Sequence, residues 1–200
     1  MYRPNAFAVD DAAVLHAFIR ARPFATLAAV VDGAVQFAYA PVVLAADGMA
    51  RFHLARGNPL VQLADGAPLR LSFLGANAYV SPDWYASEGM VPTWNYQAVE
   101  GQGTLRRLGD SALRTLLSDL SAAAENKLLP KTPWTIDKVP EARMAALLNA
   151  IVGFEMRFET LEGKFKLSQD KKPEDFDGAL RGLDARGDVA IADAMRTARR

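Results

Sequence analysis

One short segment restricts the fold of this chain more than any other: two strand-like stretches joined by the dipeptide Asp32-Gly33. Residues 26–31 are mostly apolar, and beyond the dipeptide Val35, Phe37 and Tyr39 alternate with smaller or polar residues. Asp-Gly is favoured in the two-residue turns that join adjacent antiparallel strands. Residues 24–46 are therefore predicted to form a β-hairpin, in which Pro41 marks an edge, a bend or a break.

The pattern of alternation continues beyond the hairpin. Asp47-Gly48 repeats the turn signal, and strand-like stretches follow at 49–54, 68–74, 90–106 and 154–161. Helical spacing of apolar residues occurs at 10–21, 110–125 and 140–152. Strands in meander order indicate antiparallel pairing. The expected fold class is α+β and mainly β, an antiparallel barrel with helices around it.

The end of the chain has a different character. Residues beyond Gln169 are polar and contain short helical patterns at 176–183 and 188–198. We expect one domain over residues 1–183, followed by a helical tail over 184–200. A solvated, partly frayed tail is the simplest interpretation, and a docking surface for a partner is the alternative.

Composition excludes several classes of function. Lys plus Arg and Asp plus Glu number 23 each, so a basic surplus for binding DNA is missing, although a local patch remains open. The chain has no cysteine and two histidines, which excludes a thiolate nucleophile and argues against a metal site. No apolar run approaches the ~20 residues that span a bilayer, and the first residues lack an apolar signal core. A cytoplasmic protein is expected.

Residues 163–169 are a candidate phosphate site. In an extended chain Lys164, Lys166 and Ser168 share one face. Two ammonium groups and a hydroxyl behind the flexible Gly163 could hold a phosphate. A half-buried strand with a solvated lysine face explains the same pattern.

A second candidate follows the strand at 49–54. His53 and Arg56 precede Asn58-Pro59, and Asn followed by Pro is a favoured helix start. The free amides at a helix start bind anions, but capping a helix is also a common structural task for Asn.

Aromatic residues in proline-rich loops form a third candidate. Trp84 and Trp94 either plug the ends of the barrel or border a flat, aromatic ligand. The chain has no Gly-x-Ser-x-Gly elbow and no phosphate-binding glycine loop. The helices at 110–125 and 140–152 are too far apart for a helix-turn-helix. A phosphorylated planar ligand suits these residues better than hydrolysis.

The motifs resemble those of the FMN-binding negative transcriptional regulators of the PaiB type. The stretches that carry the resemblance run in family order: Met1-Tyr2-Arg3-Pro4 with Phe7, His53 to Pro59, Tyr79 to Tyr85, Val91 to Tyr96, and Gly153 to Glu155 with Glu162 to Gln169. The resemblance covers residues 1 to about 183. It implies a split-barrel flavin-binding fold and a homodimer with FMN at or near the subunit interface.

The resemblance also implies a set of cofactor-binding residues. They are His53, Asn58, Ser81, Trp94, Asn95, Lys164 and Lys166, to which our own reading of the residues adds Arg56, Trp84 and Ser168. Our hypothesis is that Lys164, Lys166 and Arg56 neutralise the phosphate of FMN. Asn58, Ser81 and Asn95 would bond the ribityl chain or the ring edge, and Trp84 or Trp94 would border the isoalloxazine.

Competing functions follow from the same resemblance. The first is a flavin-binding regulator of transcription, acting directly or through a partner. The second is a small FMN-dependent oxidoreductase, for which His53 is a possible general acid. A third is a barrel that holds another phosphorylated ligand or a tetrapyrrole.

Overall fold

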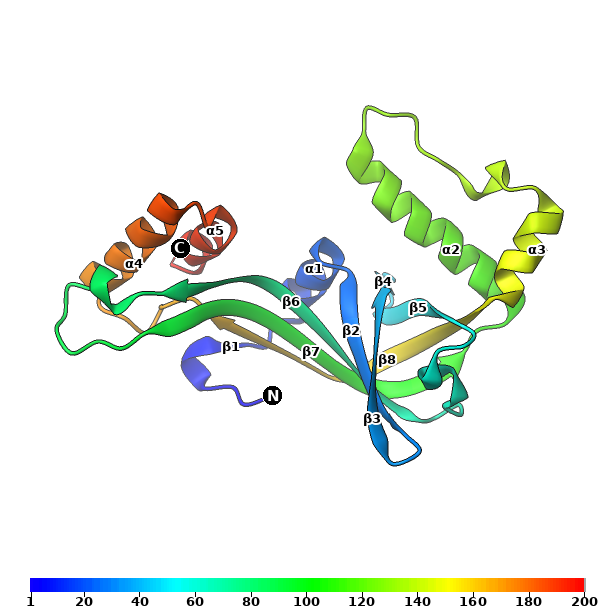
Figure 1. Cartoon of the computed structure of the whole chain (residues 1–200), viewed down its shortest axis with the longest axis horizontal. Helices are drawn as coiled ribbons and strands as arrows, with labels where there is room; N and C mark the ends of the chain where they lie inside the picture. Colours follow the sequence, from blue (N-terminus) through cyan, green and yellow to red (C-terminus); the bar gives the residue numbers. More distant parts are fainter. Residues whose placement is uncertain (200) are drawn as a thin grey trace. The chain divides into compact units, whose positions relative to one another are not determined.

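The computed structural model describes residues 1–199 and has an antiparallel sheet as its central element (Figure 1). The strand order is β3-β2-β6-β7-β8-β5-β4, with β1 paired to β8. The strands are β1 (Ala8–Val9), β2 (Phe24–Val31), β3 (Ala34–Pro41), β4 (Val43–Leu44), β5 (Met49–Ala55), β6 (Pro68–Val80), β7 (Thr93–Arg107) and β8 (Ile151–Lys166). The expected fold, an antiparallel split barrel with flanking helices, is confirmed.

Helices occupy the connections between strands and the end of the chain. The α-helices are α1 (Ala12–Ala21), α2 (Asp110–Glu125), α3 (Glu141–Asn149), α4 (Pro173–Arg186) and α5 (Val189–Ala198). The 3-10 helices are η1 (Asn5–Phe7), η2 (Pro59–Gln62), η3 (Pro82–Trp84), η4 (Asn126–Leu128) and η5 (Ile136–Lys138). Within the described chain, no helix is both long and apolar enough to cross a membrane.

The hairpin of β2 and β3 has the predicted turn. Asp32 and Gly33 adopt φ values of 51° and 78°, as the favoured two-residue hairpin turn requires at both positions. Val31 pairs with Ala34 and Val30 with Val35. Because the turn fixes this register, every second side chain of β2 faces the core, as its burial pattern shows.

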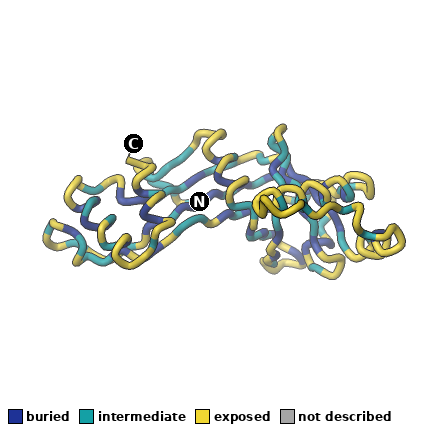
Figure 2. Tube along the Cα trace, turned by 90° about the horizontal axis from the view of Figure 1, so that it is seen from above, coloured by how far each residue is buried: buried dark blue, intermediate teal, exposed yellow. Residues whose placement is uncertain are grey.

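The described chain divides into two compact units. Unit 1 contains Met1–Leu15, Leu74–Glu100 and the residues from Glu162 onwards, whereas unit 2 contains His16–Phe73 and Gly101–Leu161. The long strands β6, β7 and β8 each contribute residues to both units. Burial is concentrated along the strands, while loops and outer helix surfaces are exposed (Figure 2).

The core of unit 2 is built mainly from buried side chains of its strands. Phe52 of β5 stacks on Phe154 of β8, with ring centroids 5.7 Å apart, and the two residues are paired across the strands. Leu27 and Leu71 pair across β2 and β6 and are fully buried. Buried residues alternate with less buried ones along β2 and β5, as the period-two pattern predicts, whereas β8 is buried at every position from 152 to 156.

The core of unit 1 joins the helical end of the chain to β6. Ala78 and Val80 pack in one cluster with residues of α4 and α5, including Phe176, Ile191 and Met195. Ile191 and Met195 are 2% and 0% exposed. The expectation of a solvated tail is therefore wrong for α5, because its apolar face completes a core. Residue 200 of the predicted tail lies outside the described residues.

Candidate functional site

A groove lies between α2 and the strands β3, β4 and β5 of unit 2. It consists of adjoining pockets of about 580 and 380 Å³, which share Pro41, Leu120 and Ala124 in their walls. The lining is mostly apolar and includes Trp134 in the smaller pocket. Both volumes fall in the range of pockets that bind small ligands. We call this feature the α2 groove.

The sequence of α2 explains why the groove stays open. Leu113 and Leu116 are buried against the rest of unit 2. Leu117 and Leu120 belong to the same apolar stripe but remain partly exposed, and both line the smaller pocket. An apolar helix face that the chain itself covers incompletely offers surface to a flat, apolar ligand.

Trp134 is held in the segment between α2 and α3 by a carboxylate at the end of α2. Its backbone N–H donates to Glu125 Oε2 at 2.8 Å, and Lys131 Nζ donates to the same oxygen. These bonds, from Lys131 and then from the Trp134 backbone, hold the pKa of Glu125 below its usual value. The segment is therefore fixed at the groove although it lacks long regular structure.

His53 is the polar residue with the clearest unmet requirement in the α2 groove. It lies on β5, paired with Gly153 of β8, and lines the smaller pocket. Its Nδ1 atom is buried and has no hydrogen-bond partner among the described residues. Burial lowers the pKa of His53, so the ring is neutral near pH 7 and carries one donor and one acceptor. An unpartnered ring nitrogen in a ligand-sized pocket is a natural contact for a heterocycle.

Cations are present in the larger pocket. Arg20 of α1 and Lys127 of η4 contribute to its lining, and both residues are exposed. Neither forms an ion pair within residues 1–199. A guanidinium and an ammonium group without carboxylate partners can bind a phosphate at this end.

Arg56 and Asn58 also belong to unit 2, but the structure gives both of them local partners. Arg56 donates through Nε to Asn149 O and through Nη2 to Ile151 O, the latter at 3.1 Å, and so holds the end of α3. Asn58 Oδ1 accepts from Leu60 N at 3.0 Å and caps η2. The predicted helix start is confirmed, but it is a single short 3-10 turn whose amide is capped by Asn58 itself.

The other predicted residues belong to unit 1, where three of them meet. Asn95, Lys166 and Ser168 line a pocket of about 240 Å³ together with Tyr85. Lys166 Nζ donates to Thr93 Oγ1 and to Trp94 O, and burial is the main cause that lowers its pKa. Lys166 and Ser168 were predicted to share one face of a strand end, and both line this pocket.

Lys164 and Ser81 have other contacts in unit 1. Lys164 Nζ donates to Tyr2 O at 3.1 Å and lies over the rings of Tyr2 and Tyr96. Ser81 Oγ accepts from Asp83 N at 3.3 Å and caps η3. Neither side chain lines the pocket that contains Lys166.

The two tryptophans of unit 1 differ in their environment. The ring of Trp84 packs so closely on α4 that a Cβ at Gly182 would lie 2.1 Å from it, and Arg186 stacks on the same ring. Trp94 is 54% exposed and meets Tyr79 edge-on. Trp84 therefore packs against α4, whereas Trp94 keeps an open ring face.

Some residues of these sites were not identified from the sequence. Trp134, Arg20 and Lys127 line the α2 groove, and Tyr85 lines the pocket of unit 1. Trp134 carried a usable signal, since it is a large aromatic residue in a proline-rich loop like Trp84 and Trp94. Within residues 1–199 no cluster of potential metal ligands was found.

Solved structures with a similar fold include flavin-binding proteins. The structure of the FAD and heme binding protein from Mycobacterium smegmatis superposes with a TM-score of 0.60 at 20% identity, covering 88% of this chain and 79% of the other. The flavocytochrome Anf3 from Azotobacter vinelandii gives a TM-score of 0.62 at 15% identity, covering 82% and 72%. At these identities the likeness establishes the fold.

Sequence relatives cover nearly all of the chain. The protease synthase and sporulation protein PAI 2 of Bacillus subtilis is 28% identical over 187 residues, which are 92% of this chain and 89% of that protein. Residues 1–160 match the family described as "Putative FMN-binding domain". Because this match takes in most of the sequence, the chain belongs to that FMN-binding family.

Proposed function

We propose that FMN binds in the α2 groove, with its flavin ring against the apolar wall and His53 at the ring edge. The observation that carries this placement is the buried, unpartnered Nδ1 of His53 in a pocket walled, apart from Ser121, by apolar side chains. A flavin has an extended apolar ring with donors and acceptors along its edges, which suits such a lining. Trp134 and Leu120 would contact the ring.

The phosphate of FMN would lie in the larger pocket. Arg20 and Lys127 supply positive charge there without carboxylate partners in the described chain. When bound, FMN supplies hydride and single-electron transfer. The residues of this chain would bind the ring, shield it from water beneath α2, and offer one neutral imidazole nitrogen for hydrogen bonding.

The pocket of unit 1 is the second candidate position for FMN. It contains Lys166, Asn95 and Ser168, which the sequence marked as phosphate and ribityl contacts. Its volume of about 240 Å³ is smaller than either pocket of the α2 groove, and its lining is more polar. We favour the α2 groove because a flavin ring requires a larger apolar surface.

Titration of the apoprotein with FMN, followed by flavin fluorescence, distinguishes the two positions. His53→Leu removes the ring nitrogen and should weaken FMN binding about tenfold, as expected for one lost buried hydrogen bond. His53→Asn places an amide near the position of Nδ1 and should restore part of the affinity. The double variant Lys164→Ala, Lys166→Ala should bind FMN like the wild type.

Two results would contradict the proposal that FMN binds in the α2 groove. One is unchanged affinity in His53→Leu with an intact circular dichroism spectrum. The other is loss of FMN in the double lysine variant, which would place the phosphate in unit 1.

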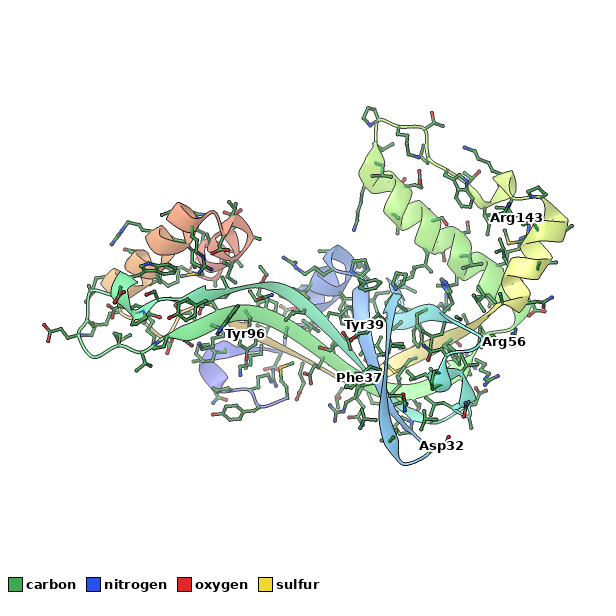
Figure 3. The ribbon with its side chains drawn as sticks, viewed as in Figure 1. Asp32, Phe37, Tyr39, Arg56, Tyr96 and Arg143 are labelled. Atoms are coloured by element: carbon green, nitrogen blue, oxygen red, sulfur yellow. The ribbon has the colours of Figure 1, made fainter. Side chains whose placement is uncertain are left out.

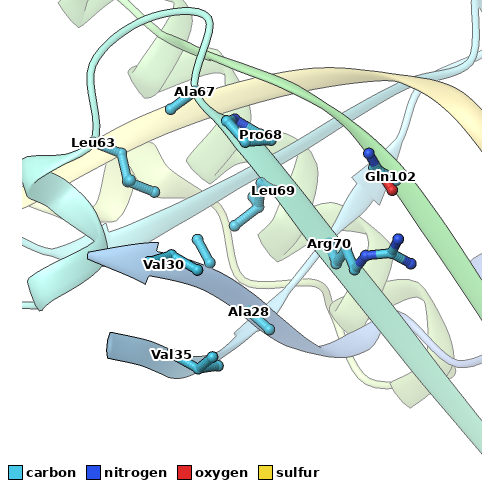
Figure 4. Close-up of a pocket in the computed structure, with 10 residues that line it drawn as sticks. Ala28, Val30, Val35, Leu63, Ala67, Pro68, Leu69, Arg70 and Gln102 are labelled. Atoms are coloured by element: carbon cyan, nitrogen blue, oxygen red, sulfur yellow. The ribbon is translucent and has the colours of Figure 1, made fainter. Parts of the chain in front are cut away.

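A homodimer is part of the same proposal. On the outer face of the β2–β3 hairpin, Phe24, Val30, Val35, Phe37 and Tyr39 are each at least 60% exposed. Figure 3 shows Phe37 and Tyr39 on β3, and Figure 4 shows the adjoining hollow of about 360 Å³, lined by Val30, Val35 and Pro68. Exposed apolar patches of this kind mark interfaces, and we assign this one to a second copy of the chain.

The hairpin also supports a flavin near the subunit interface. Tyr39 lies on the outer face of β3, whereas Pro41, two positions along the same strand, lines the α2 groove. A ligand in the groove would therefore lie close to the end of the proposed interface.

For the biological role, we favour a cytoplasmic flavin-binding regulator over an oxidoreductase. The name of the Bacillus subtilis relative refers to protease synthesis and sporulation. The formal net charge of zero argues that any effect on transcription passes through a protein partner and not through tight DNA binding. Anaerobic bleaching of the flavin by NADH or NADPH would favour the oxidoreductase, and salt-sensitive retention on promoter DNA would indicate direct regulation.

A further inference from the structure

Unit 1 contains a pocket that shares no lining residue with the α2 groove. It lies among the loop before β7, the start of β7 and the segment that follows β8, and its volume is about 240 Å³. One part of its lining is apolar, formed by Met90, Val91 and Pro92. The remainder is polar and includes Tyr85 and Lys166. We call it the Tyr85 pocket.

Two hydrogen-bond donors in the Tyr85 pocket lack a partner. Tyr85 is only 9% exposed, and its buried hydroxyl has no partner within hydrogen-bonding distance in the described chain, apart from a weak interaction with Ser168. The ammonium group of Lys166 has three N–H donors, and its bonds to Thr93 Oγ1 and Trp94 O use two of them. One N–H of Lys166 and the O–H of Tyr85 remain for a ligand, and a buried donor without a partner is costly.

The polar side chains beside these donors already form hydrogen bonds with each other. Asn95 is fully buried and donates from Nδ2 to Ser168 Oγ at 2.9 Å and to Met195 Sδ at 3.4 Å. Ser168 donates in return to Asn95 Oδ1 at 3.2 Å. These groups fix the wall of the pocket, and the ligand contacts are left to Tyr85 and Lys166.

The charges of the pocket select one class of anion. A carboxylate has two oxygens that can accept from two donors and one negative charge that pairs with Lys166. Asp170 also lines the pocket, with Lys171 at 3.4 Å as its ion-pair partner. Lys171 lines the pocket as well and offsets this carboxylate, so the net charge of the lining is that of Lys166, which a singly charged acid neutralises. The apolar wall has room for a short aliphatic tail.

We propose that the Tyr85 pocket binds a short-chain carboxylate, with Lys166 and Tyr85 as its donors and Met90, Val91 and Pro92 around its tail. The site is independent of the position proposed for FMN. The bound acid would connect β7 to the segment after β8, and so make unit 1 responsive to a small metabolite.

Titration of the flavin-loaded protein with sodium butyrate tests this proposal. Amide chemical shifts in a ¹H–¹⁵N spectrum should saturate, with the largest changes around residues 85, 95 and 168. Lys166→Met should weaken binding about tenfold or more, and Tyr85→Phe about fivefold, as expected for a lost charged and a lost neutral hydrogen bond. Lys172→Met, which removes a neighbouring ammonium group that does not line the pocket, should leave butyrate affinity unchanged.

Neutral butyramide and inorganic phosphate serve as matched probes. Shift changes of equal size with butyramide would show that the charge is not recognised, and tighter binding of phosphate would show that the wrong anion was chosen. Absence of saturation by about 10 mM butyrate would also overturn the proposal. Loss of FMN in Lys166→Met, read from the visible spectrum, would instead identify the pocket as the flavin phosphate site.

Discussion

Asn95 and Ser168 hydrogen-bond each other in both directions across 73 positions of sequence, at 2.9 and 3.2 Å. Both side chains are buried, at 0% and 2% exposure. The backbone of Ser168 adopts a φ of 62°, in the left-handed region that residues with a Cβ rarely enter. The mutual bond therefore holds an unfavourable backbone conformation next to the Tyr85 pocket.

Substitution of Ser168 separates the hydroxyl from the backbone conformation. Ser168→Ala leaves the Asn95 amide without its partner and keeps the Cβ, so we expect a loss of about 1–3 kcal/mol in the free energy of unfolding. Ser168→Gly loses the same bond but suits a positive φ, and should be less destabilised. Urea unfolding measures both. If the glycine variant is the less stable one, backbone strain at Ser168 does not lower the free energy of unfolding.

Glu155 should make the stability of the protein depend on pH. It is 5% exposed and accepts from Arg106 Nε at 2.9 Å and Arg51 Nε at 3.2 Å. Burial opposes its ionisation, but the bonds from Arg106 and Arg51 prevail and hold the pKa of Glu155 below its ordinary 4.5. We expect Glu155→Gln to cost about 2 kcal/mol at pH 7, from charged hydrogen bonds replaced by weaker ones.

The sign of this pH dependence follows from the lowered pKa. The contribution of Glu155 is fully present above about pH 4.5 and is lost as the pH falls through its lower value in the folded protein. Urea unfolding of wild type and Glu155→Gln should therefore differ at pH 7 and converge in acid. Glu159→Gln, an exposed change on the same strand, is the control. A constant difference across the pH range would contradict the ion-pair explanation.

Gly182 is required by the ring of Trp84. A Cβ at this position would lie 2.1 Å from the ring, and the backbone of Trp84 is itself packed against Gly178 of the same helix. Gly182→Ala should therefore destabilise unit 1 by about 1–3 kcal/mol, although alanine favours helices. Gly57→Ala, where a Cβ meets no atom within 4 Å, is the matched control. Thermal unfolding in which both variants match the wild type would show that Trp84 moves freely.

Phe37 should be necessary for self-association. It is 60% exposed on the outer face of the hairpin, and Phe37→Glu would introduce a charge at the centre of the proposed interface. We expect the variant to elute as a monomer in size-exclusion chromatography with light scattering, whereas the wild type is a dimer. Ser118→Glu, an exposed change on α2, should remain dimeric. A wild-type monomer at all concentrations would refute the assignment.

The strands and helices were predictable because their signals are local. The Asp32-Gly33 turn, the period-two strands and the helical stripe of α2 all appear in the structure near their expected bounds. The cores follow from the same periodicity. The exception is α5, whose polar surroundings in the sequence gave no sign that Met195 lies in a core.

The sites were less predictable because each one depends on residues that are distant in sequence. Lys166 and Ser168 line the same pocket, as grouped, but Lys164 does not. Strand alternation is not the reason, because β8 ends at Lys166 and Ser168 follows it with a positive φ. Local periodicity cannot indicate that Trp134 and His53 line the same pocket. Nor can it indicate that the guanidinium of Arg56 donates a hydrogen bond to Asn149 O. Such pairings are set by the packing of whole elements, which a single sequence does not display.

The positions along the chain of the segments that form unit 1 have a consequence for biosynthesis. This unit gathers segments from the beginning, the middle and the last part of the described chain, and its core includes Met195 of α5. During translation, unit 2 has all of its residues once Leu161 has emerged from the ribosome, whereas unit 1 still lacks its closing helix. The Tyr85 pocket should therefore form after the groove of unit 2.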